Sequence, residues 1–247
     1  MKYGIQMYSL RDVTANDFEG ALKAVAEMGY KMVETAGFFK HPAEEVKAML
    51  EHYGLEICST HTGYKELFDK FDETLEYHKK VGCKNIILPS APFATREGIT
   101  YTVDSINRFQ PIIEAEGMKL HYHNHSKEFL PNYDGQIAED ELAKRTKVNF
   151  ELDTFWVYTA GLDPLAVMEQ YKDRLYFIHL KDGIAERDSE TGKAIGKSVG
   201  SGNAPVVDVR NKAIEMELNI VIESEGLDPA GPEEAKRCID FLMGLEK

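Results

Sequence analysis

Two hydrophobic patterns alternate along the chain. Short apolar runs, typical of buried strands, are each followed by a stretch in which apolar residues recur every three or four positions, as on the buried face of a helix. Phe18, Leu22, Val25 and Met28 show the helical spacing, and Gly29 follows where a helix commonly ends. The chain is therefore predicted to alternate strands with helices.

Eight strand-and-helix units follow one another without a Pro- or Ser-rich linker. We expect strands near residues 3–9, 31–35, 55–60, 85–88, 118–123, 148–153, 175–180 and 219–223, and helices near 16–28, 42–53, 66–81, 100–116, 136–145, 164–172, 206–216 and 232–245. Strands joined by helices pair in parallel, because each helix carries the chain back across the sheet. Eight such units can close on themselves, and we predict a single-domain (β/α)8 TIM barrel over residues 1–247.

The main alternative is an open, doubly wound α/β sheet. Its dinucleotide-binding form carries GxGxxG after the first strand. This chain has neither that motif nor the phosphate-binding GxxxxGK[ST]. The closed barrel is the favoured fold.

Composition argues against several classes of partner. Hydrophobic residues make up 43% of the chain and charged residues 29%, as in ordinary globular proteins. The formal net charge is −13 and no run of Lys or Arg stands out, which disfavours nucleic acid and anionic membranes as partners. The three cysteines, Cys58, Cys83 and Cys238, are expected to be buried thiols. We predict a cytoplasmic protein without signal peptide or membrane span, and leave homo-oligomer formation open.

Ionisable side chains gather at the ends of the last four predicted strands. These ends run from His121 to Glu128, Glu151 to Asp153, His179 to Asp182 and Val221 to Glu225. In a (β/α)8 barrel such ends meet at one rim, where the active site lies. Charges inside a barrel are costly unless they are paired or bind a cation. One divalent ion would account for them together, and mainly carboxylate ligands with an imidazole suit Mn²⁺ best, with Mg²⁺, Co²⁺ or Zn²⁺ as alternatives.

Each of these residues also has a purely structural interpretation. Asp153 could cap a helix, His179 could be a hydrogen-bonded core histidine, and Glu223 or Glu225 could form ion pairs. His121 lies deepest in the fifth strand and is the histidine expected in the core.

Two further features allow two interpretations. Trp156, the only tryptophan, either packs in the core or stacks on a sugar face. Gly200-Ser201-Gly202 is either an anion-binding turn before a helix or, as is more frequent, a polar loop.

Four motifs resemble those of the sugar phosphate isomerase/epimerase superfamily, the xylose isomerase-like TIM barrels. They are HNHxxEF from His123 to Phe129, ELDxxW from Glu151 to Trp156, HLKD from His179 to Asp182, and VIESE from Val221 to Glu225. The opening residues from Gln6 to Asp12 fit the same group, so that the resemblance covers nearly the whole chain. The superfamily includes ketose 3-epimerases, inosose dehydratases and apurinic endonucleases.

The resemblance implies one Mn²⁺-type ion bound by Asp153, His179 and Glu223, together with a ligand from the fifth strand. Epimerases of this group have a glutamate in that strand, where this chain has His123. Glu128, in the loop just beyond, is the favoured replacement, and His123 is the alternative.

The expected reaction removes a proton next to the carbonyl of a sugar or keto-sugar and passes through an enediolate, as isomerases, epimerases, dehydratases and lyases do. Candidate catalytic residues are Glu223, His123, His125 and Lys181, and candidate substrate contacts are Gln6, Tyr8, His61, Trp156 and Glu225. The competing hypotheses are a non-catalytic barrel that binds metal and sugar and, less favoured by the acidic charge, an apurinic endonuclease-like hydrolase.

Overall fold

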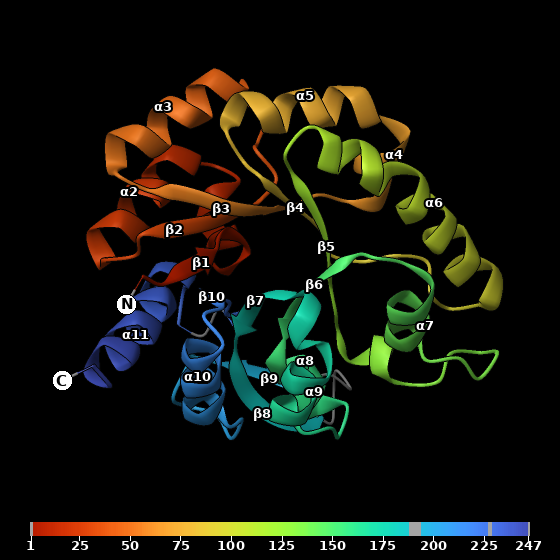
Figure 1. Cartoon of the computed structure of the whole chain (residues 1–247). Helices are drawn as coiled ribbons and strands as arrows, with labels where there is room; N and C mark the ends of the chain where they lie inside the picture. Colours follow the sequence, from red (N-terminus) through yellow and green to blue (C-terminus); the bar gives the residue numbers. More distant parts are fainter. Residues whose placement is uncertain (1, 188–193, 227–228, 247) are drawn as a thin grey trace.

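The structure, a computed structural model, describes residues 2–187, 194–226 and 229–246. Parallel strands close into a barrel in the order β1-β10-β7-β6-β5-β4-β3-β2, and helices cover its outside (Figure 1). The predicted (β/α)8 TIM barrel is confirmed, and the open doubly wound sheet is excluded. Residues 1 and 247 of the predicted domain, and part of the predicted loop after the seventh strand, 188–193, lie outside the described ranges.

The barrel strands are short and each is followed by at least one helix. The strands are β1 (Gly4–Gln6), β2 (Met32–Ala36), β3 (Glu56–His61), β4 (Asn85–Leu88), β5 (Lys119–His123), β6 (Asn149–Asp153), β7 (Leu175–Leu180) and β10 (Asn219–Ile222). The longer outer helices are α2 (Phe18–Met28), α3 (Ala43–Tyr53), α5 (Phe71–Val81), α6 (Arg96–Ala115), α7 (Ala138–Arg145), α9 (Pro164–Tyr171), α10 (Val206–Glu215) and α11 (Gly231–Gly244).

Helix α2 illustrates how local sequence sets these boundaries. The carboxylate of Asp17 accepts the backbone N–H of Gly20 at 2.8 Å and caps the start of the helix. Gly29 ends it with φ at 107°, a left-handed conformation that glycine adopts without strain. Between these ends, Leu22 and Val25 are fully buried against the barrel. The apolar spacing in the sequence therefore predicted the correct face.

Short elements between the main ones were not predicted. The expected first strand, 3–9, is only β1, because the chain turns at η1 (Met7–Leu10) and α1 (Arg11–Thr14). The remaining short elements are α4 (Tyr64–Asp69), η2 (Ser126–Phe129), α8 (Thr154–Thr159), η3 (Lys172–Arg174) and the antiparallel hairpin of β8 (Asp182–Arg187) and β9 (Ala194–Lys197). Most of them lie where a barrel strand ends, so they shape the rim that carries the site.

The strand register brings the polar residues of different strands to the same level. Asp153 of β6 pairs with His179 of β7, and Gln6 of β1 pairs with Glu34 of β2. Because alternate residues of a strand face the same side, His121 and His123 both point inward from β5. His121 is fully buried one layer below, where its Nε2 lies 3.0 Å from Asn85 Oδ1. Its predicted place in the core agrees with this packing.

All three cysteines are buried free thiols, as the sequence predicted. Within the described ranges, no helix combines the length and the apolar composition that a membrane span requires.

A buried histidine ties α5 to the end of β3. His78 Nδ1 lies 2.7 Å from the carbonyl oxygen of Thr74, and its Nε2 lies 3.1 Å from the hydroxyl oxygens of both Thr60 and Thr62. A carbonyl oxygen only accepts, so Nδ1 carries the hydrogen and Nε2 accepts from the threonines. Burial lowers the pKa of His78, and the ring is neutral in the folded protein. The hydrogen bonds of His78 therefore fix Thr60 and Thr62, the two residues that flank His61.

We expect His78 to make the protein less stable in acid. The unfolded chain binds a proton at this site near pH 6.5 and the folded protein does not, so stability is complete above that pH and falls below it by at most about 1.4 kcal/mol per pH unit. The measurement is urea unfolding of the native chain and of His78→Gln at pH 7.5, 6 and 5. The variant should be less stable at pH 7.5 but should lose less stability on acidification. Equal pH slopes for the two proteins would contradict this interpretation.

Candidate active site

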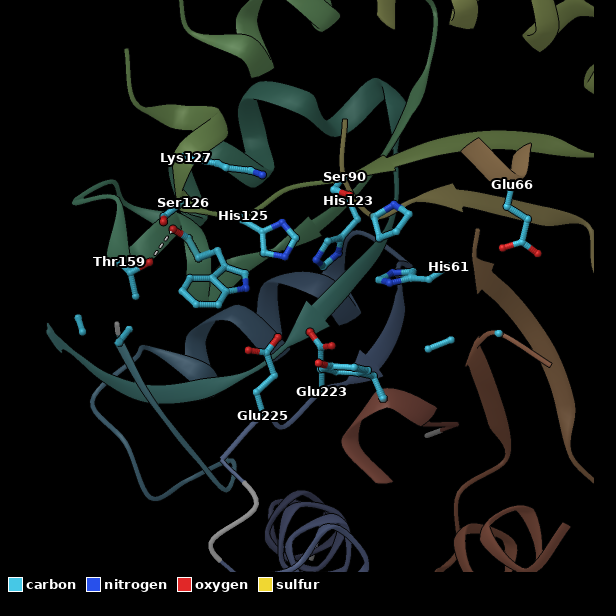
Figure 2. Close-up of a pocket in the computed structure, with 17 residues that line it drawn as sticks. His61, Glu66, Ser90, His123, His125, Ser126, Lys127, Thr159, Glu223 and Glu225 are labelled. Atoms are coloured by element: carbon cyan, nitrogen blue, oxygen red, sulfur yellow. Dashed lines mark hydrogen bonds between the residues drawn. The ribbon is translucent and has the colours of Figure 1, made fainter. Parts of the chain in front are cut away.

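A cavity of about 880 Å³ opens at the rim where the barrel strands end (Figure 2). Its lining comes from the ends of β3, β5 and β10, from α8, and from the β8–β9 hairpin. The lining includes His61, His123, His125, Trp156, Glu223 and Glu225. The structure therefore brings together, around one cavity, residues from strand ends that are far apart in the sequence.

His179 lies at the centre of a buried network beneath this cavity. Its Nε2 lies 2.7 Å from Glu34 Oε1 and 3.2 Å from Glu151 Oε2, and its Nδ1 lies 3.2 Å from Glu223 Oε2. His61 Nε2 lies 3.1 Å from Glu34 Oε1 and 2.8 Å from Glu151 Oε2. The imidazole of His179 is thus placed between carboxylates from three different strands.

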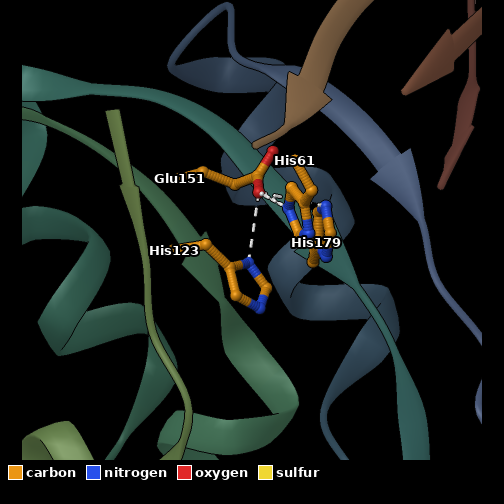
Figure 3. A group of neighbouring side chains, drawn as sticks. All are labelled: His61, His123, Glu151 and His179. Carbon is orange, nitrogen blue, oxygen red and sulfur yellow. Dashed lines mark hydrogen bonds and ion pairs between the residues drawn. The ribbon is translucent and has the colours of Figure 1, made fainter. Parts of the chain in front are cut away.

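Two overlapping sets of side chains have the spacing of a metal site, with ligand atoms that all lie within 4.8 Å of one another. We call them the Asp153 group and the Glu151 group, and they share two histidines. The Asp153 group is His123, Asp153, His179 and Glu223, and the Glu151 group is His61, His123, Glu151 and His179 (Figure 3). The structure therefore places together the three residues predicted as ligands from the sixth, seventh and eighth strands.

The hydrogen bonds distinguish the two groups. In the Glu151 group, a single oxygen, Glu151 Oε2, already lies within 3.2 Å of nitrogens of His61, His123 and His179. In the Asp153 group, Asp153 Oδ1 accepts the N–H of Trp156 at 2.9 Å, whereas Oδ2 is buried and has no hydrogen-bond partner. A buried carboxylate oxygen without a partner is costly, and a cation would satisfy it. Glu151 Oε1 is also buried without a partner, but Glu151 Oε2 is already bonded to three imidazoles and is the only carboxylate of its group. The Asp153 group offers two carboxylates and two imidazoles, a donor set that suits a divalent ion better.

The sequence left open whether Asp153 caps a helix or binds a metal, and its two oxygens allow both roles. Its Oδ1 caps α8, as the structural interpretation predicted, and its Oδ2 faces the cluster. Lys181 Nζ lies 3.9 Å from that second oxygen. Burial raises the pKa of Asp153 to about 7, against the attraction of Lys181. A divalent ion next to Oδ2 would offset this cost of burial.

Attraction between neighbours outweighs burial at Glu34, His61 and His179, whereas burial raises the pKa of Glu151 and lowers that of His123. Burial acts to raise the pKa of Glu34, but His61 and His179 hold it well below its usual range. Burial acts to lower the pKa of both histidines, but the carboxylates raise that of His61 to about 10 and that of His179 well above its ordinary value. Glu34 and the two imidazoles therefore stabilise one another as ions.

Glu34 is a site residue that the sequence analysis missed. It is fully buried in β2 and accepts hydrogen bonds from Gln6 Nε2 at 2.6 Å and Ser59 Oγ at 2.5 Å, besides its contacts with His179 and His61. An acidic residue inside an otherwise apolar strand was the available signal. Gln6, predicted as a substrate contact, does not line the cavity, because its side chain is buried and is used to hold Glu34 and to cap η1.

Glu128, the favoured fifth-strand ligand, belongs to neither candidate metal group of the described chain. Its Oε1 accepts the hydroxyl of Tyr122 at 2.9 Å, and its Oε2 accepts the backbone N–H of His125 at 2.9 Å. This local capping of η2 turns the carboxylate away from the cluster. His123, the alternative, takes the fifth-strand position instead. Its Nδ1 faces Glu151 at 3.1 Å, so Nε2 is the ring nitrogen that points away from Glu151.

Glu225 and the rings of Trp156 and His125 line the cavity next to Lys181, a predicted catalytic residue that does not itself line it. Lys181 Nζ lies 2.7 Å from Glu225 Oε1 and 4.4 Å from the ring centroid of Trp156. His125 stands 5.8 Å from the same ring, and both its Nδ1 and Trp156 Nε1 are buried without a hydrogen-bond partner. Tyr8 also lines the cavity and is exposed. Apart from Gln6, the predicted substrate contacts therefore all line the cavity.

The fold and the site together define a TIM barrel with a candidate metal centre at the carboxyl ends of its strands. The family described as xylose isomerase-like TIM barrel matches residues 22–243, and the chain belongs to this family. The family predicted from the four sequence motifs is therefore confirmed.

Individual relatives show similarity at low identity. An inosose dehydratase of Geobacillus kaustophilus is 28% identical over 85% of this chain and 80% of its own. A 2-oxo-tetronate isomerase of Haemophilus influenzae is 27% identical, and its alignment covers 56% of this chain and 64% of the relative. A solved structure described as a sugar phosphate isomerase/epimerase from Parabacteroides distasonis is 26% identical, with a TM-score of 0.80 over 98% of both chains.

We expect Glu34 to set the affinity of the candidate metal centre without contacting the ion. A histidine ligand is oriented when its second nitrogen donates to a carboxylate, and losing such a partner costs roughly 10- to 100-fold in metal affinity. Glu34→Gln should weaken Mn²⁺ binding by that factor in calorimetric titration of the metal-free protein.

Glu66→Gln is the matched control, because Glu66 also lines the cavity but is exposed and lies outside both groups. Its Mn²⁺ affinity should equal that of the native chain. Unchanged affinity in a folded Glu34→Gln protein would refute the role of Glu34.

Proposed function

We propose that this protein is a divalent-metal-dependent enzyme that removes a proton next to the carbonyl of a sugar or keto-sugar. The observation that carries the proposal is the Asp153 group, in which two carboxylates and two imidazoles present ligand atoms within 4.8 Å at the base of the cavity. The family and the relatives, named as an inosose dehydratase and a 2-oxo-tetronate isomerase, support a substrate with a carbonyl beside hydroxyl-bearing carbons. Isomerisation, epimerisation and dehydration all begin with that proton transfer.

Mn²⁺ is the favoured metal. The ion would be held by four atoms of the Asp153 group, which are Asp153 Oδ2, Glu223 Oε2, His179 Nδ1 and His123 Nε2. When bound, the ion would supply Lewis acidity to the substrate carbonyl. Glu34 accepts from Nε2 of His179 and so presents Nδ1 toward Glu223. In this arrangement Glu223 and His123, both predicted as catalytic residues, are metal ligands instead.

Two other histidines are placed to move the proton. In Figure 2, His125 and His61 lie to either side of His123. His125 Nδ1 is buried at the cavity without a hydrogen-bond partner and so can accept a proton. His61 Nε2 is held between Glu34 and Glu151, whose charges raise the pKa of the ring to about 10, so Nδ1–H is the hydrogen that remains to be donated. We assign His125 as the base and His61 as the acid on the other side of the substrate.

Lys181 and Trp156 complete the arrangement. The ammonium group lies 3.6 Å from Glu223 and 3.9 Å from Asp153, so it can stabilise negative charge that develops on a nearby substrate oxygen. The indole at the wall can stack on the apolar face of a sugar ring. These two side chains orient the substrate over the Asp153 group.

Replacement of Asp153 should abolish both metal binding and turnover. The experiment measures Mn²⁺ binding and, by NMR in D2O, exchange of the proton next to the carbonyl in D-fructose, D-tagatose and inosose. The Mn²⁺-loaded native chain should exchange at least one of them, the EDTA-treated chain none, and Asp153→Ala should neither bind the ion nor exchange any sugar.

Asp163→Ala is a matched control, because Asp163 also caps a helix and its Oδ1 accepts the N–H of Leu165 at 3.0 Å. Loss of a cap costs roughly 1 kcal/mol of stability. This variant should therefore be somewhat less stable but should bind Mn²⁺ normally. An Asp153→Ala protein that retains exchange would overturn the proposed function.

A further inference from the structure

We infer that the substrate carries no phosphate group and is a neutral keto-sugar or glycoside. This inference rests on the proposed function and specifies its substrate class. Three independent features of the described chain support it: the loops that commonly bind phosphate are filled by the protein's own carboxylates, the cavity wall is acidic, and the unpaired groups at the cavity suit hydroxyls.

The first filled loop follows β7. TIM barrels frequently bind phosphate on backbone N–H groups of the loops after their last two strands. Here the carboxylate of Asp182 accepts the N–H groups of Gly183 at 2.8 Å, Gly200 and Gly202 at 2.9 Å, and Ala204 at 3.2 Å. Asp182 is only 1% exposed. The turn at Gly200–Gly202 therefore does bind an anion, as one interpretation of the sequence allowed, but the anion is a side chain of the same protein.

Close packing fixes Asp182 in this position. A Cβ atom added at Gly202 would lie 2.2 Å from Asp182 Oδ1, so that the glycine is needed for the backbone to approach the carboxylate. The four N–H groups point at two oxygens that are already fully used. A phosphate would have to displace a buried carboxylate to reach them.

The second filled position is the start of α11, after the last barrel strand. The N–H of Gly231 donates to Asp12 Oδ2 at 3.0 Å, and a Cβ at Gly231 would lie 2.5 Å from Asp12 Oδ1. The positive end of this helix is thus neutralised by a carboxylate from α1. Both places where this fold usually receives a phosphate already hold a negative charge.

The charges around the cavity also oppose a dianion. Glu66, Glu223 and Glu225 line it, whereas Lys127 is the one Lys or Arg that does so among the described residues. The Lys127 side chain is 61% exposed and its Nζ lies 3.9 Å from Glu128 Oε1, so it offers little net attraction.

The other nearby cations are already paired. Lys181 forms its closest ion pair with Glu225 and is covered by Trp156. The Arg11 guanidinium donates to the backbone oxygens of Tyr8 and Glu225 and stacks on the Tyr8 ring. No arginine among the described lining residues is therefore available to bind a phosphate through two hydrogen bonds.

The uncharged polar groups of the lining suit a neutral ligand. Trp156 Nε1 and His125 Nδ1 are buried without partners, and hydroxyls of Ser90, Ser126 and Thr159 also line the cavity. Such groups match the donors and acceptors of sugar hydroxyls, and the indole face matches the C–H face of a pyranose ring.

The test compares each keto-sugar with its own phosphate monoester, for example D-fructose with D-fructose 6-phosphate, by calorimetric titration of the Mn²⁺-loaded protein. The neutral sugar should bind at least about tenfold more tightly. Binding of the ester that is equal or tighter would overturn the inference. Higher salt should narrow the difference in affinity between the sugar and its ester, because screening weakens the repulsion of the phosphate by Glu66 and Glu225.

Glu225→Gln tests the charge argument separately. Removing this carboxylate leaves Lys181 without its closest counter-ion, so the affinity for the ester relative to that for the neutral sugar should rise about fivefold. A purely structural effect would weaken both ligands alike and would contradict the role of Glu225. Glu186→Gln, an exposed residue of β8 outside the cavity lining, is the control and should change neither affinity.

Failure of this inference differs from failure of the proposed function. If the neutral sugar binds more tightly but exchanges no proton with D2O, the inference stands and the proposed reaction is wrong. If the ester binds more tightly and exchanges, the reaction stands and the inference is wrong. Where no keto-sugar binds, inorganic phosphate is titrated into the metal-free protein. Saturable binding with Kd below about 1 mM would then count against the inference, and its absence would support it.

Discussion

The structure depends on the pairing of buried carboxylates with imidazoles inside the barrel. Glu34, Glu151 and Glu223 surround His179, and none of these four side chains is more than 5% exposed. An ion buried without a partner costs several kcal/mol, so each carboxylate is tolerated only because the strands bring it to an imidazole or an ammonium. Removing one member would leave its partners as uncompensated charges. The same network therefore supports the barrel and orients the candidate metal ligands.

Asp153 Oδ2 is a buried carboxylate oxygen that no hydrogen bond satisfies, and it belongs to the candidate metal centre. Asp153 places Oδ1 at the start of α8 and Oδ2 among His179, Glu223 and Lys181. The position follows from the register, since Asp153 of β6 pairs with His179 of β7. The helix cap at Oδ1 thus fixes the direction of Oδ2, the oxygen that we propose as a metal ligand. The carboxylates of Asp182 and Asp12 likewise accept backbone N–H groups that could otherwise bind an anionic group of a substrate.

The sequence predicted the barrel and singled out most of the residues that the structure brings together at the candidate site, because both depend on local patterns and on which end of a strand a residue occupies. Glu34 was missed because its role arises from a contact with His179, 145 residues away, that no local pattern records. Glu128 was favoured over His123 for its residue type, but a local hydrogen bond to the N–H of His125 decides its direction. The β8–β9 hairpin was missed because its two strands are short and lie in a stretch whose glycines resemble a loop.

The most direct test of the central claim is a crystal structure of the protein soaked with Mn²⁺, with anomalous data collected at the manganese edge. The account predicts one strong peak within coordination distance of Asp153 Oδ2, His179 Nδ1, Glu223 and His123, with His179 Nε2 still bonded to Glu34. A peak between His61 and Glu151, or a cluster that excludes the ion at saturating Mn²⁺, would contradict it.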